Sequence, residues 1–235
     1  MAKFVILHLY PETLRLNGES GNVLALTKRS ESLGISPSVV SADIEEPLPT
    51  KRPDLIFIGS GTLSATMVAG KDLLTKDAQI HRWVTEGTKV LAVGTGFDLI
   101  SKELVLEDGR RLPGLALTNT SHRVTGKHLV GEVVLGAKFA GFINSDREIS
   151  RGDDGFELGI VQSSDEPRLV GYVDGYTDGK VWGSNVQGPL LPMNPHLADA
   201  ILLSVFPKLV FGSELKSLDV LSAKARKAIS ARVGR

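Results

Sequence analysis

Residues 88–101 read TKVLAVGTGFDLIS, an apolar run, a glycine turn and a second apolar run in direct succession. The first run, 89–93, carries two valines between polar residues, which is typical of a strand buried in a parallel sheet. Gly94-Thr95-Gly96 follows at once, and the apolar residues after it have helical spacing. A strand, a sharp glycine turn and a helix in this order predict a nucleophile elbow, which holds one side chain above the sheet.

The first hundred residues alternate between strand and helix patterns. This alternation favours a doubly wound sheet of mostly parallel strands with helices on both faces. One helix pattern ends at Gly34 and has Asn22 as its expected cap, and another ends at Gly87. The expected strands are 3–9, 37–42, 54–58 and 89–93, and the expected helices are 23–33 and 71–87.

After residue 101 the pattern changes to short strands separated by glycine- and aspartate-rich turns. Asp108-Gly109 is a strong hairpin signal between 104–106 and 111–117. We therefore expect a smaller antiparallel portion beside the parallel sheet, all within a single domain of residues 1–235. Further strands are expected at 130–135, 139–143, 169–173 and 180–184, and helices at 195–205 and about 213–235.

Composition narrows the possible functions. Lys plus Arg and Asp plus Glu number 27 each in 235 residues, so net charge gives no reason to expect nucleic acid or an anionic membrane as partner. Cysteine is absent, which removes disulfides, thiolate metal sites and thiol catalysis. The five histidines lack metal-ligand spacing, so we expect no metal. No apolar run approaches the roughly 20 residues of a spanning helix, so we expect a cytoplasmic protein without direct membrane insertion.

Three stretches together are similar to one enzyme family. They are HLYP at 8–11 with NGESGN at 17–22, IGSG at 58–61 with the elbow at Gly94, and QGPLLPMNP at 187–195. In order and spacing they resemble the class I glutamine amidotransferases, within these the cobyric-acid-synthase-like (CobB/CobQ) branch, and in that branch the GatD group. The resemblance implies a flavodoxin-like, three-layer α/β fold. It also implies a MurT-like partner of the Mur-ligase type, to which such a subunit supplies ammonia.

The family's chemistry requires two side chains that this sequence lacks. By resemblance, a cysteine at the elbow attacks the glutamine amide, and a histidine that opens the third stretch shuttles the proton. The cysteine position is Gly94, which has no side chain. The histidine position is Gln187, which forms hydrogen bonds but takes up no proton near neutral pH. We therefore expect no intact catalytic residue. We expect a degenerate docking or regulatory subunit associated with peptidoglycan (lipid II) amidation.

A substrate pocket is still expected around the elbow. Backbone N–H groups of the glycine turn at 59–61 would hold an oxyanion, although such a turn is more often a plain connection to the next helix. The Thr95 hydroxyl is expected to point away from the elbow. Two alternatives remain open: an active amidotransferase or hydrolase with non-standard groups, and a protein that senses glutamine or a related amide without a cofactor. The candidate pocket residues are Gly59, Ser60, Gly61, Thr95, His128, Asn144, Gln187 and Gly188.

Overall fold

A computed structural model describes residues 2–136 and 139–234. Within these residues a six-stranded sheet has the order β11-β12-β4-β3-β1-β2. Its pairs are parallel except for the edge pair β11/β12. The strands are β1 (Lys3–Leu9), β2 (Ser36–Ala42), β3 (Leu55–Ile58), β4 (Lys89–Val93), β11 (Tyr176–Thr177) and β12 (Val181–Ser184).

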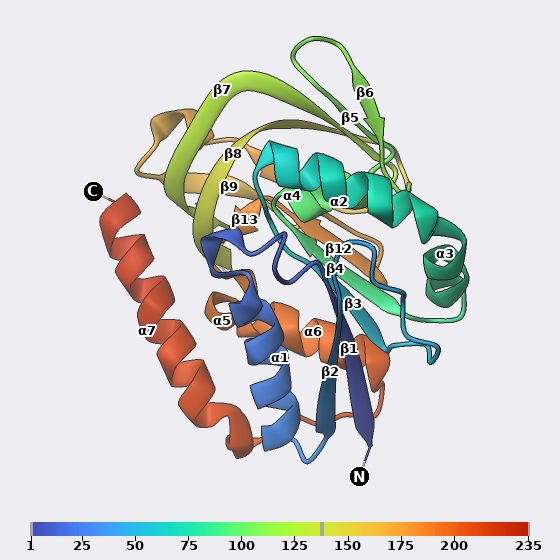
Figure 1. The fold of residues 1–235 in the computed structure, drawn as a ribbon. Helices are drawn as coiled ribbons and strands as arrows, with labels where there is room; N and C mark the ends of the chain where they lie inside the picture. Colours follow the sequence, from blue (N-terminus) through green and yellow to red (C-terminus); the bar gives the residue numbers. More distant parts are fainter. Residues whose placement is uncertain (1, 137–138, 235) are drawn as a thin grey trace.

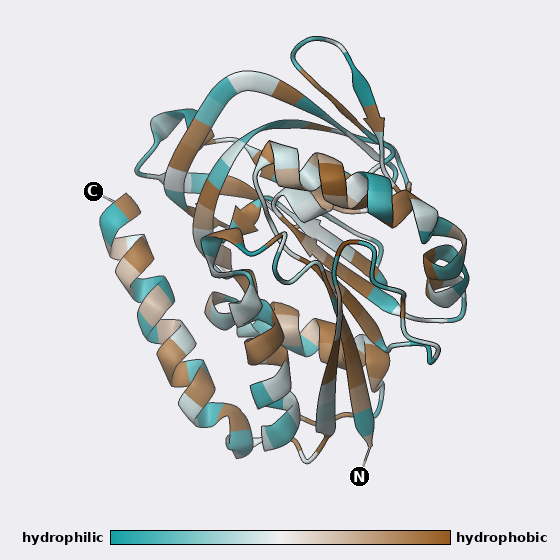
Figure 2. Ribbon diagram, in the orientation of Figure 1, coloured by the Kyte–Doolittle hydropathy of each residue, from teal (hydrophilic) through white to brown (hydrophobic). Residues whose placement is uncertain are grey.

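Helices cover both faces of this sheet, which gives three layers (Figure 1). On β3, Leu55 and Phe57 face the core shared with α1 and α6, whereas Ile56 and Ile58 face the core shared with α2, α3 and α4. Strands buried on both faces read as continuous apolar runs, and the central strands are accordingly hydrophobic along their length (Figure 2). The helices are α1 (Ser20–Ser32), α2 (Leu63–Thr75), α3 (Asp77–Thr85), α4 (Thr95–Ile100) and α6 (Pro195–Val205).

A second, mainly antiparallel sheet follows the elbow helix. Its two long strands, β7 (Thr120–Leu135) and β8 (Phe139–Arg151), arch over one end of the parallel sheet (Figure 1). The β7/β8 register shifts between Val124 and Leu129, so a bulge interrupts the ladder there. The remaining strands are β5 (Glu103–Val105), β6 (Arg111–Pro113), β9 (Gly159–Ser164), β10 (Val173–Asp174) and β13 (Val186–Gln187).

The last helix lies along the outside of the molecule. α7 (Lys216–Val233) runs beside α1 and contacts α5 (Leu190–Met193), β7 and β8 (Figure 1). Its buried residues are Ser222, Ile229 and Val233. Three short 3₁₀ turns complete the described structure: η1 (Leu16–Gly18), η2 (Pro167–Leu169) and η3 (Ser213–Leu215).

The sequence predicted the elbow strand and the helix at 195–205 with the observed bounds. Strands 130–135 and 139–143 are the ends of the much longer β7 and β8. The prediction of one helix over 71–87 is wrong. α2 begins at Leu63, where the Thr62 hydroxyl accepts a hydrogen bond from Ala65 N, and α3 begins again after Lys76.

Two further predictions need correction. Residues 169–173 form no single strand, because Val170 N and Tyr172 N donate to Pro167 O and Leu169 O and turn the chain. Helix α1 starts at Ser20 rather than at residue 23. Asn22 lies inside it and does not cap it, because its side chain bonds Glu19 and the backbone N of Leu191 instead. The division of the chain into one domain stays a prediction.

No helix in residues 2–136 or 139–234 combines the length and the apolarity that crossing a membrane requires.

Candidate functional site

Gly94 joins β4 to α4 in a backbone conformation that suits glycine. Its φ is 59° and its ψ is −127°, and its N–H donates to Ser184 O over 2.8 Å. Residues with a Cβ rarely adopt this region, and enzymes that place a nucleophile there hold it under strain. The elbow predicted from the sequence is therefore present, without the side chain that an elbow normally displays.

The Ser60 side chain occupies the space next to Gly94. A Cβ built on Gly94 would lie 2.4 Å from Ser60 Oγ and 2.7 Å from Ser60 Cβ, closer than real Cβ contacts. The same Cβ would lie 2.8 Å from Gln187 Oε1. Ser60 is itself buried, at 3% exposure. The space beside the elbow is thus filled by a hydroxyl from the turn that follows β3.

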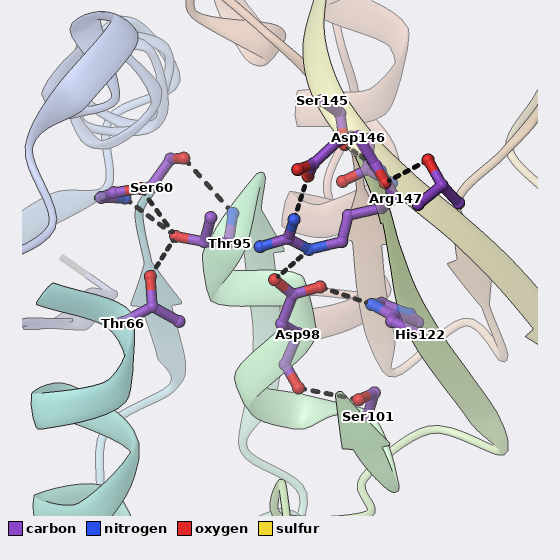
Figure 3. Close-up of polar contacts among 12 residues, drawn as sticks. Ser60, Thr66, Thr95, Asp98, Ser101, His122, Ser145, Asp146 and Arg147 are labelled. Atoms are coloured by element: carbon purple, nitrogen blue, oxygen red, sulfur yellow. Dashed lines mark hydrogen bonds and ion pairs between the residues drawn. The ribbon is translucent and has the colours of Figure 1, made fainter. Parts of the chain in front are cut away.

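Two backbone N–H groups at the elbow already have acceptors. Thr95 N donates to Ser60 Oγ over 3.3 Å, and Gly61 N donates to Thr95 Oγ1 over 2.9 Å (Figure 3). The Thr95 hydroxyl also accepts from Thr66 Oγ1 over 2.8 Å. The Thr95 hydroxyl therefore points to Gly61 and Thr66. Donors used in this way are not free to hold an oxyanion, which needs N–H groups aimed at the developing charge.

Gln187 is held by neighbours on both sides. Its Oε1 accepts from Asn17 Nδ2 over 2.7 Å, and its Nε2 donates to the backbone O of Asn144 over 3.1 Å. His128, displayed by the bulge in β7, forms a 2.5 Å hydrogen bond between Nε2 and Asn144 Oδ1. Gln187 is 1% exposed. A carboxamide, held by one hydrogen bond at its oxygen and one at its nitrogen, therefore stands where the resemblance implies a base.

These groups surround one cavity of about 330 Å³. The structure brings seven of the predicted positions to its wall and leaves Gly59 and Gly188 off it. Gly59 lies behind the turn, where a Cβ would meet Leu14 O at 2.5 Å. The predicted positions on the wall are Ser60, Gly61, Gly94, Thr95, His128, Asn144 and Gln187.

A buried ionic network next to the cavity was not predicted. Asp98 on α4 accepts from Arg147 Nε over 2.8 Å and bonds His122 Nδ1 over 2.7 Å (Figure 3). Arg147 also pairs with Asp146, and both line the cavity. Burial alone would lower the pKa of Arg147, but Asp98 and Asp146 raise that pKa above its ordinary value. Arg147 therefore stays charged and ties the elbow helix to β8.

Thr120, His122 and Asp98 resemble a catalytic triad in their order of contacts: His122 Nδ1 bonds Asp98, and His122 Nε2 lies 3.1 Å from Thr120 Oγ1. Asp98, His122 and Thr120 are each at most 2% exposed, and none of them lines the cavity. A base must reach the reacting group to transfer a proton. This relay is thus a packed element of the core and does not act on a ligand in the cavity.

His8 and Glu19, both in the first matched stretch, are buried. His8 Nε2 and Glu19 Oε1 each lack a hydrogen-bond partner among the described residues. Burial lowers the pKa of His8 to about 4, against a smaller opposing effect of Asp43. Burial raises the pKa of Glu19 to about 8, although the hydrogen bond from Asn22 lowers it. Glu19 is therefore largely protonated at neutral pH, and it is fully buried.

Comparison with solved structures identifies the fold. A glutamine amidotransferase aligns over 88% of this chain and 100% of its own, with a TM-score of 0.51 and 16% identity. A glutamine amidotransferase from Methylobacillus flagellatus aligns over 97% and 92%, again with a TM-score of 0.51 and 16% identity. The fold is that of the class I glutamine amidotransferases, as expected from the sequence.

Sequence comparison finds relatives in one group of glutamine amidotransferases, the GatD subunits. GatD, a subunit of the glutamine-hydrolysing lipid II isoglutaminyl synthase, is 26% identical in Streptococcus pneumoniae over 86% of this chain and 80% of the relative. The Staphylococcus aureus GatD is 24% identical over 93% and 91%. No protein-family model matches the chain. Fold and sequence together support a GatD-like class I glutamine amidotransferase family for this chain.

Proposed function

We propose that the chain is a catalytically degenerate, GatD-like subunit that docks on a MurT-like ligase and regulates or supports lipid II amidation. We further propose a cytoplasmic location for this complex. The observation that carries the proposal is the elbow itself. Gly94 has no nucleophile, the Ser60 hydroxyl fills the space beside it, and a carboxamide stands at Gln187.

The energetics favour docking over catalysis. Removal of the nucleophile or base of a catalytic unit typically costs on the order of a millionfold in rate. Here both are replaced, and two N–H donors of the elbow are bonded to side-chain hydroxyls. No single substitution restores such a site. A retained scaffold without a nucleophile or base suits a subunit that works through its surface.

The test combines a binding and an activity measurement. The chain and the MurT-like ligase of its host are purified together, and complex mass and glutamate release from glutamine are measured. We expect a stoichiometric complex by light scattering and a glutamate release below about one per second, the low end of usual enzyme rates. A chain that stays alone with every host ligase would overturn the docking role. Turnover at ordinary enzyme rates would overturn the degenerate site.

One observation favours the alternative of a non-standard hydrolase. Ser60 Oγ lies next to the elbow, so a hydroxyl could take the place of the missing thiol. A serine hydroxyl needs an adjacent base, and the group that Ser60 Oγ bonds is the N–H of Thr95, which is a donor. The variant Ser60→Ala distinguishes the degenerate subunit from the hydrolase. Hydrolysis of glutamine that disappears in this variant supports the hydrolase.

The cavity also favours a glutamine-sensing role as a second candidate. At about 330 Å³ it has room for an amino acid, and its wall carries amide and hydroxyl groups that pair with a carboxamide. Titration calorimetry with glutamine and glutamate tests this role. Saturable heat that Asn144→Ala abolishes supports sensing, and a silent titration leaves docking alone.

A further inference from the structure

The Arg147 side chain has hydrogen-bonding capacity that the described residues do not use. Its Nε donates to Asp98 over 2.8 Å, and its Nη1 pairs with Asp146. Its Nη2 has no partner among the described residues, although the side chain is only 7% exposed. Figure 3 shows this nitrogen pointing from β8 toward Thr95. A guanidinium carries five N–H donors, so the free edge of this buried one matches an acceptor that the chain does not supply.

The free edge of Arg147 faces the elbow cavity, the cavity of about 330 Å³ described above. Asp146 and Arg147 line this cavity and also a neighbouring one of about 810 Å³. Thr95, toward which Nη2 points, lines only the elbow cavity of the two. Within the described residues, the wall of the elbow cavity therefore carries one carboxylate and one guanidinium side by side.

The charges of this cluster disfavour a simple anion or a simple amine as ligand. Asp98 and Asp146 already contact the single guanidinium, and Asp146 Oδ2 accepts no hydrogen bond from the described residues. A ligand with a carboxylate alone would bring a third negative charge to one positive charge. A ligand with an amine alone would leave Arg147 Nη2 unpaired. A ligand with both groups adds no net charge and gives each side chain a charged partner.

The part of the cavity next to the elbow offers weaker contacts. Gly61 N and Thr95 N already donate to side-chain hydroxyls, so they are not available to a ligand. Leu16 and Leu63 add apolar surface to the wall. A ligand side chain would therefore meet neutral groups, and neutral hydrogen bonds contribute less to binding than bonds to charged groups. Affinity should depend mainly on the charged end of the ligand.

We propose that the elbow cavity binds a free α-amino acid by its head group, with the carboxylate on Arg147 and the ammonium on Asp146, and discriminates only weakly between side chains. An α-amino acid carries both charges on one carbon, which fits a cation and an anion that pair with each other on one strand. Asp98 fixes the guanidinium in advance, which lowers the ordering cost of binding. This inference deepens the sensing role, the second candidate function, and rests on it.

Titration calorimetry on the full chain compares four ligands. Glutaramate is glutamine without the α-amino group, and 4-aminobutanamide is glutamine without the α-carboxylate. We expect each of these two to bind at least about 10-fold more weakly than L-glutamine, because each loses a hydrogen bond to a charged group. L-Methionine has a side chain of similar length without an amide, and it should bind within about 10-fold of L-glutamine.

A matched pair of variants tests the residues. Asp146→Asn removes the charge that would hold the ammonium, and it should weaken glutamine binding by about 10-fold or more. Glu148→Gln is the control, because Glu148 lies on the same strand, pairs with Arg123 and does not line the elbow cavity. Equal thermal unfolding temperatures show that both variants are folded. The ligand series on the wild-type chain decides the question if Asp146→Asn does not fold.

The outcomes separate this inference from the functions proposed above. Glutaramate that binds as tightly as glutamine, methionine that gives no heat, or a folded Asp146→Asn variant with unchanged affinity overturns the inference and leaves a sensing role standing. Silent titrations with all four ligands overturn the inference and the sensing role together. Docking on the ligase is measured separately by light scattering, so neither result decides it.

Discussion

At the residue scale, Gly94 and Ser60 exclude a nucleophile by two independent means. The positive φ of Gly94 disfavours every residue with a Cβ, and the Ser60 hydroxyl occupies the space that the Cβ requires. Backbone strain of this type costs about 1–3 kcal/mol, and overpacking costs a similar amount. The two effects can be measured separately, because Ser60 is removable without changing the backbone of the elbow.

We predict that Gly94→Cys lowers the free energy of unfolding by about 2–4 kcal/mol. Gly94→Cys with Ser60→Gly should recover about half of this loss, because the overlap disappears while the backbone strain stays. Urea denaturation of the two variants and of Ser60→Gly alone provides the double-mutant cycle. A Gly94→Cys variant as stable as the wild type would contradict the overlap.

The missing thiol and the overlap with Ser60 should also limit the release of glutamate from glutamine. The triple variant Gly94→Cys, Ser60→Gly, Gln187→His restores the thiol, its space and the base. We expect it to release glutamate from glutamine at least about 100-fold faster than the wild-type background. The double variant Gly94→Cys, Gln187→His keeps Ser60 and should stay near background. Equal activity of the two variants would show that Ser60 does not block the site.

Glu19 predicts a pH dependence of stability. Its pKa is raised to about 8 in the folded chain, so the unfolded chain loses this proton first as the pH rises. The free energy of unfolding should therefore fall by about 2 kcal/mol between pH 6.5 and pH 8. The lowered pKa of His8 affects stability only at lower pH. As the pH falls below about 6.5, His8 takes up a proton in the unfolded chain before it does so in the folded chain, which lowers the free energy of unfolding.

Denaturant titrations at several pH values measure this effect. Glu19→Gln should remove most of the decline above pH 6.5, whereas Glu31→Gln, on the exposed side of α1, should leave it unchanged. If the free energy of unfolding still declines in Glu19→Gln, another titratable group causes the decline.

At the scale of elements, the ion pair between Arg147 and Asp98 joins α4 to β8. Both side chains are buried, at 7% and 1% exposure. Removing one partner leaves an uncompensated buried charge, so Arg147→Met should lower the free energy of unfolding by about 3–5 kcal/mol. Arg110→Met breaks an exposed pair with Asp108 and should cost at most about 1 kcal/mol. Chemical denaturation measures the free energy of unfolding of both variants. Similar losses in Arg147→Met and Arg110→Met would contradict a structural role for Arg147.

Local sequence predicted those elements whose signals are local. Val93-Gly94 marks the end of β4 by an apolar run and a glycine, and Pro195 marks the first residue of α6. The break between α2 and α3 at Lys76 has no such signal, because no glycine or proline stands there. In β7, Gly126 has a positive φ of 67° and lies in the bulge. Its bulge lies inside a long strand because β8 pairs on both sides of it.

At the scale of the whole molecule, the protection of backbone amides from hydrogen exchange should depend on the layer in which they lie. β1, β3 and β4 are covered by helices on both faces, whereas β6 and α7 are largely exposed. Hydrogen exchange followed by mass spectrometry should therefore show the slowest exchange in the central parallel strands and the fastest in β6 and α7. Slow exchange in α7 of the isolated chain would contradict its weak attachment.

The candidate site shows where sequence reasoning ends. Gly94 and Gln187 could be found because family motifs frame them, and the fold brings them together as that resemblance implies. The closure by Ser60 and the pair of Asp98 with Arg147 could not be found. Each depends on side chains from separate elements, and no spacing in the sequence encodes their distance.

The contact between Ser60 and the elbow also has an evolutionary consequence. A change of Gly94 to cysteine alone would meet a steric penalty from Ser60 before it added a nucleophile, and a change of Gln187 to histidine alone would add a base without a nucleophile. Under the proposed function, no single substitution at these positions would therefore give selection a gain in glutamine hydrolysis.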